Sequence, residues 1–199
     1  MPAPSDAQPD RNAVRRRAML DAGVGLLGAI EGGAVNVRAV CRSTGVTERY
    51  FYEIFGNRDD FVRAVFEDVT AQARVALVEA AESGGDYRAL ASAAVDAFVS
   101  LVIDSPEKGR VLMLAPYREQ VLVEVGLGHQ PEFFDLVATA FQGDVAEDAR
   151  RLLSVELVGA LTALFTQFLG GTLDVGRDRL VEHCVDMLVA AADRAGPAS

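Results

Sequence analysis

A single glycine separates two short helical segments, and this spacing constrains the fold more than any other feature of the sequence. Asn36 offers a side-chain cap for a helix over 37–44, which Gly45 ends. Only Val46 then precedes Thr47, whose hydroxyl caps a helix that continues to about residue 52 or 54. Two short helices joined by a tight glycine turn form a helix-turn-helix, a motif whose second helix enters the major groove of DNA.

The rest of the sequence also favours helices. Residues 11–30 place apolar side chains at an i, i+4 spacing and predict one helix. Further helices are predicted over 59–82, 87–103, 107–115, 118–127, 132–141, 145–169 and 178–194, with glycine and proline between them. The predicted fold class is all-α, with an N-terminal three-helix head and a C-terminal helical body. We divide the chain into a disordered tail (1–10), a helix-turn-helix DNA-binding domain (11–58) and a helical body (59–195), for which the family resemblance described below implies effector sensing and dimerisation.

Charge is distributed unevenly along the chain. The formal net charge of −10 by itself argues against a nucleic-acid-binding protein. Between residues 11 and 49, however, seven arginines stand against three acidic residues, whereas from Phe61 onward 11 basic residues stand against 21 acidic ones. A basic head on an acidic body indicates that only the head meets phosphate.

Several classes of protein are disfavoured. Two cysteines far apart in the sequence and two histidines form no metal-ligand spacing, so neither metal nor cofactor is expected. No nucleophile elbow, phosphate-binding loop or Ser/His/Asp series is present, which disfavours an enzyme. Charged residues and glycines interrupt the apolar stretches before the length of a membrane span, so we expect a cytoplasmic protein without membrane contact.

The segment 45–61, GVTERYFYEIFGNRDDF, resembles the signature of the tetracycline-repressor (TetR) family of transcriptional regulators. Segments 19–22 and 37–40 are similar to the first two helices of that family, so the close resemblance covers about residues 15–66. The resemblance implies a homodimer that binds a pseudo-palindromic operator in double-stranded DNA and a body that senses a small molecule. Glu48 and Arg49 differ from the residues that the family usually carries at these positions.

Helical geometry predicts which side chains face DNA in the second helix of the helix-turn-helix, which begins after Thr47. If Phe51 packs inward, Arg49, Tyr52 and Glu53 point outward, with Glu48 and Tyr50 on the flanks. Arginine can donate to guanine, and glutamate can accept a hydrogen bond from cytosine. The resemblance implies base contacts from Arg38 and phosphate contacts from Tyr52 and Arg58. The predicted DNA-binding residues are Arg15, Arg16, Arg17, Asn36, Arg38, Thr47, Glu48, Arg49, Tyr50, Tyr52 and Arg58.

Structural roles compete with these assignments. The run from Arg15 to Arg17 contacts phosphates or is merely solvated surface. Tyr50 faces DNA or is a half-buried aromatic of the head. Arg49 contacts a base or forms a surface ion pair with Glu48.

Short central helices of this family frame a ligand cavity, and aromatic residues of the corresponding segments are candidates for its lining. These candidates are Phe98, Met113, Tyr117, Phe134, Phe141 and Phe165, with Phe133 beside them. The alternative is that these side chains form ordinary core. A cavity with this lining predicts a mostly apolar effector.

The helix predicted over 145–169 is apolar on two sides, and such a helix is buried on two sides. With the last helix, it predicts a four-helix dimer interface across a twofold axis. The predicted interface residues are Leu152, Val155, Gly159, Ala160, Ala163, Cys184, Met187 and Leu188. The alternative is that both sides belong to the core of a monomer.

The sequence therefore predicts a regulator that represses transcription and is released by a small molecule. The alternative is a DNA-binding dimer without such an effector, which a protein partner controls or which acts constitutively.

Overall fold

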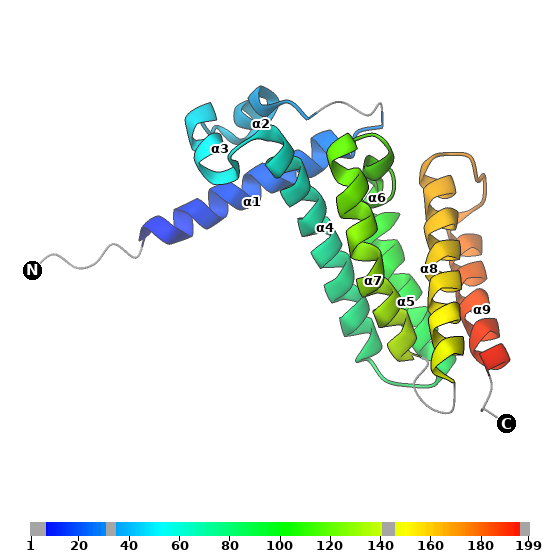
Figure 1. Cartoon of the computed structure of the whole chain (residues 1–199). Coiled ribbons are helices and arrows are strands. Elements are labelled where there is room, and N and C mark those ends of the chain that lie inside the picture. Colours follow the sequence, from blue (N-terminus) through cyan, green and yellow to red (C-terminus); the bar gives the residue numbers. More distant parts are fainter. Residues whose placement is uncertain (1–6, 31–34, 141–145, 196–199) are drawn as a thin grey trace, which may run out of the picture.

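The computed structural model describes residues 7–30, 35–140 and 146–195, and in these ranges it contains helices and no strand. The helices are α1 (Ala7–Leu27), α2 (Val37–Thr44), α3 (Glu48–Phe55), α4 (Arg58–Ala81), α5 (Tyr87–Val102), α6 (Pro106–Met113), α7 (Val123–Ala140), α8 (Glu147–Leu169) and α9 (Arg177–Ala195), with single 3₁₀ turns η1 (Ala115–Tyr117) and η2 (Gln120–Leu122). The all-α prediction is confirmed. Helices α1 to α3 form a head at one end, and α8 and α9 form the opposite edge of the body (Figure 1).

Local capping fixes the helix-turn-helix as the sequence predicts. The Asn36 side chain accepts a hydrogen bond from the backbone N–H of Arg38 and begins α2. Gly45 ends α2 in the left-handed conformation, with φ of 67°, which a residue without Cβ adopts at little cost. The Thr47 hydroxyl then accepts from the N–H of Tyr50 and begins α3. The turn and both of its flanking caps therefore come from the residue types in this one short segment.

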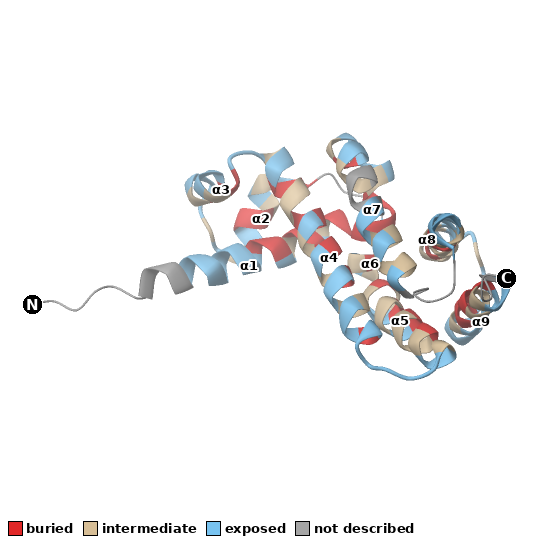
Figure 2. Ribbon diagram, turned by 60° about the horizontal axis from the view of Figure 1, so that its bottom comes forward, coloured by how far each residue is buried: buried red, intermediate tan, exposed pale blue. Residues whose placement is uncertain are grey.

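Aromatic packing joins the head to the body. Phe51 and Phe55 of α3 contact Phe61 of α4, with ring centroids 5.0 and 4.8 Å away respectively. Phe51 and Phe61 are completely buried, and the core continues from them through α4 into α5 and α9. Figure 2 shows this run of buried residues from the head into the body. The head is therefore held by a core that it shares with the body.

Two predicted boundaries are wrong. Helix α1 begins at Ala7, so residues 7–10 are helical and do not belong to a disordered tail. Pro9 fits there because the first backbone N–H groups of a helix have no partner within the helix. At its other end, α1 stops at Leu27, three residues before the predicted end.

The two short helices predicted over 118–127 and 132–141 are also wrong. Residues 120–122 form a 3₁₀ turn, and α7 then runs without a break through Gly126 and Pro131. A Cβ at Gly126 would lie 3.3 Å from Pro116 of η1. Glycine is therefore present at this position because η1 packs closely against the helix, and it does not end the helix.

Two glycines of α1 should respond oppositely to a methyl group. A Cβ at Gly23 would lie 2.5 Å from Val65 and 2.7 Å from Phe61, both completely buried in α4. We expect Gly23→Ala to lower the free energy of unfolding by about 1–3 kcal/mol through overpacking. The matched control is Gly25→Ala, where a Cβ meets nothing within 4 Å, and it should stabilise the helix by about 0.5–1 kcal/mol. Urea unfolding of both variants checks this prediction, and equal changes at the two sites would contradict it.

Candidate DNA-binding surface and ligand cavity

The exposed side of α3 carries the side chains that the sequence predicts for it. Arg49 keeps 90% of its side chain exposed, and Tyr52 is 47% exposed, whereas Phe51 on the opposite side is buried. Glu53 is exposed beside Arg49. The predicted orientation of α3 is therefore confirmed, and this surface has room to approach another molecule.

Each arginine on this surface lies next to a carboxylate. Arg38 Nε lies 3.3 Å from Glu48 Oε1, which joins α2 to α3. Arg49 Nε donates a hydrogen bond of 2.9 Å to Glu53 Oε1 one helical turn away. The alternative that paired Arg49 with Glu48 is therefore wrong, because Glu48 lies against Arg38 and a different carboxylate lies against Arg49.

The N-terminal half of α1 is held against α3 by polar and cation–π contacts. The Tyr50 hydroxyl donates a hydrogen bond of 2.6 Å to the side-chain oxygen of Asn12, a residue that the sequence analysis did not single out. The Arg15 guanidinium lies 5.2 Å from the centroid of the Tyr50 ring, and that of Arg16 lies 5.6 Å from that of Phe55. Both arginines remain exposed. Tyr50 is thus half-buried and bonded to α1, and its predicted contact with DNA stays a prediction.

Arg17 has acidic partners inside the protein, unlike Arg15 and Arg16. Its guanidinium lies 2.6 Å from Asp68 of α4 and 2.7 Å from Asp21. The hydrogen bond to Asp68 raises the pKa of Arg17 above its usual value. This guanidinium therefore ties α1 to α4, and its predicted phosphate contact stays a prediction.

Arg58 likewise has partners inside the protein. It donates to Glu119 at 2.6 Å, to Asp59 at 3.0 Å and to the backbone oxygen of Val35 at 3.1 Å. The hydrogen bond to Glu119 raises the pKa of Arg58. The side chain is 31% exposed and joins the segment before α2 to the loop between η1 and η2. Arg58 therefore connects head and body, and its predicted phosphate contact stays a prediction.

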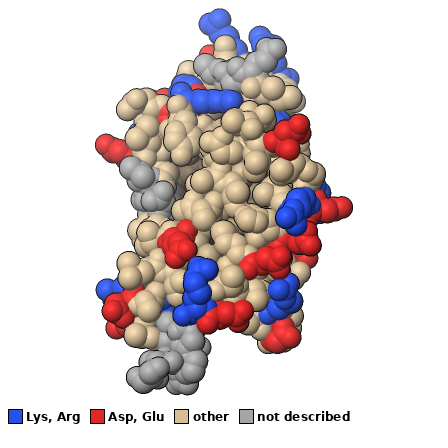
Figure 3. Space-filling model, turned by 90° about the vertical axis from the view of Figure 1, so that its right-hand side faces the viewer, with Lys and Arg blue, Asp and Glu red and all other residues tan. Residues whose placement is uncertain are grey.

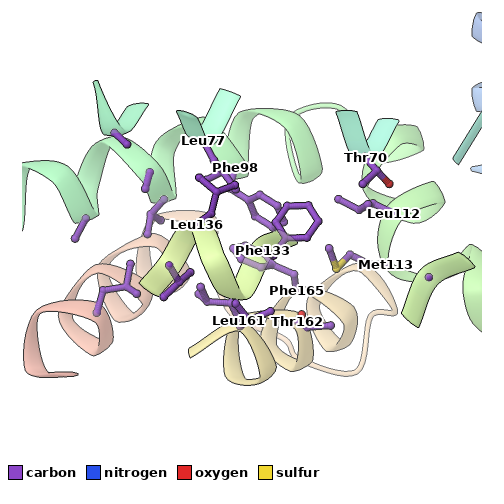
Figure 4. A pocket seen from close by; sticks show the side chains of 18 of the residues that line it. Thr70, Leu77, Phe98, Leu112, Met113, Phe133, Leu136, Leu161, Thr162 and Phe165 are labelled. Atoms are coloured by element: carbon purple, nitrogen blue, oxygen red, sulfur yellow. The ribbon is translucent and has the colours of Figure 1, made fainter. Parts of the chain in front are cut away.

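A large apolar cavity lies in the body between α4, α5, α7 and α8. Its volume is about 720 Å³, within the range of small-molecule sites. Figure 4 shows apolar side chains from these helices surrounding it. Its lining residues with hydroxyl groups are Thr70, Tyr87, Tyr117, Thr139 and Thr162, and no charged side chain is among its described lining residues. Burial raises the pKa of Tyr87 to about 12, so its phenol is neutral at physiological pH.

Five of the predicted lining residues line this cavity, namely Phe98, Met113, Tyr117, Phe133 and Phe165. Phe134 is not among them, because the unbroken α7 turns Phe133, Leu136 and Val137 toward the cavity. Phe141 lies outside the described residues. Residues of α4, among them Leu77, complete the lining, and the sequence analysis missed them because their apolar spacing is the same as that of core residues.

Helix α6 contacts both the cavity and the head. Its Leu112 and Met113 line the cavity, and two residues earlier Arg110 Nε donates a hydrogen bond to the backbone oxygen of Gly28. A Cβ at Gly28 would lie 2.2 Å from the backbone oxygen of Glu107 of α6, so the two backbones are in direct contact. Helix α6 therefore connects the cavity with the end of α1 through direct contacts.

The outer side of α8 is an apolar surface that none of the described residues covers. Leu152 is 72% exposed and Val155 is 54% exposed. Ala163 is exposed as well, and a Cβ at Gly159 would meet nothing within 4 Å. Figure 3 shows a broad uncharged area on this side of the molecule, with most charges around its border.

Helix α9 requires a correction. Cys184 is completely buried and Leu188 is 8% exposed, and Leu188 also lines the cavity. Both pack inside the protomer because α9 lies against α5, so they are not free to form an interface. Ala160 and Met187 are half-buried.

Helix α8 is the one described helix that is by itself long and apolar enough to cross a membrane. Only 17% of its most apolar window is buried in the protomer. The length and hydropathy of α8 are equally consistent with a helix that lines the cavity on one side and packs against a second copy of the chain on the other.

No family model and no curated protein matches the sequence. Solved structures do match over nearly the whole chain. A TetR-like transcriptional regulator from Rhodococcus sp. RHA1 is 22% identical, with a TM-score of 0.68 over 92% of this chain and 95% of its own. The fatty acid degradation regulator FadR from Bacillus halodurans is 16% identical, with a TM-score of 0.71 over 87% of this chain and 97% of its own. A TetR-family regulator from Mesorhizobium loti is 14% identical, with a TM-score of 0.71 over 94% and 98%. This chain therefore has the fold of the TetR-type transcriptional regulators.

Proposed function

We propose that the protein is a DNA-binding transcriptional regulator that acts in the cytoplasm as a homodimer and is not an enzyme. The observation that carries this proposal is the helix-turn-helix, whose exposed α3 side bears Arg49 and Tyr52 and adjoins Arg38 of α2. The mainly basic and polar residues at the surface of the head suit phosphate and base contacts.

The outer side of α8 supports the dimer. A single helix-turn-helix contacts only a half-site, and two heads related by a twofold axis contact a pseudo-palindromic operator. Leu152, Val155, Gly159, Ala160 and Ala163, with Met187 of α9, are the proposed interface residues.

The cavity supports a small-molecule effector, and the lining without charged groups favours a mostly apolar one. A ligand weakens DNA binding only if it prefers a conformation in which the two heads no longer match the operator. Helix α6, which lies between the cavity and α1, and helix α4, which carries Arg58, are the proposed route. This cavity favours repression relieved by a ligand over the alternative regulator without an effector.

Selection of bound fragments from a random oligonucleotide pool tests the function. Full-length protein should enrich a sequence with twofold symmetry, whose half-site centres are about 34–36 Å apart or a multiple of that distance. Fragments enriched without a common sequence would contradict sequence-specific regulation.

Arg15 and Arg16 are the proposed phosphate contacts at the start of the head. Arg15→Ala should weaken binding to operator and to random DNA by the same factor, because phosphate contacts carry no sequence information. The slope of log affinity against log salt concentration should flatten by roughly one unit for each phosphate that is no longer neutralised, or two per dimer. Arg74→Ala on the exposed surface of α4 is the matched control and should leave the slope unchanged. A weaker affinity for the operator alone would instead indicate a base contact.

A further inference from the structure

We propose that each arginine–glutamate pair on the head recognises one G·C base pair as a unit, so that Glu48 and Glu53 help to determine operator specificity. This inference rests on the proposed DNA binding and goes beyond it, because it names the base pair that each unit selects.

In each pair, the guanidinium and the carboxylate both remain able to form hydrogen bonds with DNA. In Arg38 and Arg49 it is Nε that faces the carboxylate, at 3.3 and 2.9 Å. Among the described residues, their terminal guanidinium nitrogens donate no hydrogen bond, and the side chains are 77% and 90% exposed. Each pair therefore presents two donor groups next to a carboxylate that can accept, and both point away from the core of the head.

This arrangement matches one kind of base-pair edge. In the major groove, guanine presents O6 and N7 as acceptors, and the paired cytosine presents the N4 amino group as a donor. A guanidinium over guanine places the neighbouring carboxylate toward that amino group. In an A·T pair, adenine presents an amino donor beside N7, and thymine presents an acceptor oxygen and a methyl group. The guanidinium would then face a donor, and the carboxylate would face an acceptor and a methyl group.

Charge gives the carboxylates a second effect on specificity. Helix α3 contains Glu48 and Glu53 and a single arginine, so it carries a net negative charge where it would approach phosphates. Such a helix gains little from sequence-independent attraction. A carboxylate that faces no cytosine amino group would lose bound water at the interface without gaining a hydrogen bond from DNA, which selects against every other base pair.

The test compares Glu48→Gln with the wild-type dimer on the selected operator. In a series of operators, each base pair of the half-site is replaced symmetrically. Wild-type protein should lose about 30- to 25,000-fold in affinity when the G·C pair facing Arg38 is replaced by A·T in both half-sites. Glu48→Gln should reduce this difference at that one position, leave the other positions unchanged and bind random DNA more tightly. Glu79→Gln, an exposed carboxylate of α4 away from the head, is the matched control and should change neither quantity.

Four outcomes would overturn the inference. If Glu48→Gln keeps the full preference at every position, Glu48 only holds Arg38. If it changes affinity for operator and random DNA by the same factor, its effect is one of general charge. If wild-type protein binds an operator whose half-sites lack G·C, the inference is overturned while the proposed function stands. A wild-type protein without any sequence preference would overturn both.

Discussion

Gly159→Arg is expected to convert the dimer to a monomer and to weaken operator binding ~100- to 10,000-fold, because the two heads then bind independently. Gly159 lies on the outer side of α8 next to Ala163 and Val155. An arginine there would be buried without a partner in the dimer, which costs several kcal/mol. Sedimentation velocity and binding to the selected operator measure the two effects.

The protomer itself should tolerate this substitution. A Cβ at Gly159 meets nothing within 4 Å, and arginine is a better helix former than glycine. Circular dichroism should therefore show a folded monomer. Gly176→Arg is the matched control, since a Cβ there also meets nothing within 4 Å and the residue precedes α9 outside the proposed interface. A Gly159→Arg protein that remains dimeric with unchanged affinity would place the interface elsewhere.

The second large effect concerns the charge of the ligand. N-phenyl-1-naphthylamine, a neutral apolar probe, is expected to bind at least about 100-fold more tightly than 8-anilinonaphthalene-1-sulfonate, which adds one anionic group to the same frame. No charged side chain is among the described residues that line the cavity, and burying a charge without a partner costs several kcal/mol. Each 1.4 kcal/mol corresponds to a tenfold change in affinity. Fluorescence titration of the dimer measures both affinities.

A variant shows whether the neutral probe occupies the cavity. Ala94 of α5 lines the cavity, and Ala94→Trp should fill part of it and abolish binding of the neutral probe. Ala89→Trp on the exposed side of the same helix is the control and should leave binding intact. In the wild-type dimer, the neutral probe should also lower operator affinity. Equal binding of both probes would contradict an uncharged site, and probe binding without any effect on operator affinity would contradict the proposed coupling.

Features that depend on neighbouring residues could be predicted from the sequence. The bounds of α2 are as predicted because Asn36 and Gly45, which cap it, adjoin the helix. The orientation of α3 follows from the 100° rotation between successive residues. Gly126 and Pro131 misled the prediction of α7 because a glycine required for close packing has the same local signature as one that ends a helix.

Features that depend on distant residues could not be predicted. Arg17 and Arg58 find their carboxylates 51 and 61 positions further along the chain, and no local pattern indicates such a pair. Periodicity likewise identifies apolar sides of helices without saying what covers them. The same reasoning assigns Leu152 and Cys184 to one interface, yet Leu152 is exposed and Cys184 is completely buried in the protomer.

The exposed apolar side of α8 also has a consequence for the lifetime of a newly made subunit. Until it meets a second copy, such a subunit displays a long apolar helix, the kind of surface that chaperones bind and that promotes aggregation and degradation. Subunits at a concentration below the dissociation constant of the dimer would pair slowly and be removed. Subunits at a higher concentration would survive as dimers. Abundance of the regulator would then depend more steeply than linearly on its rate of synthesis, which gives the cell a threshold before any operator is occupied.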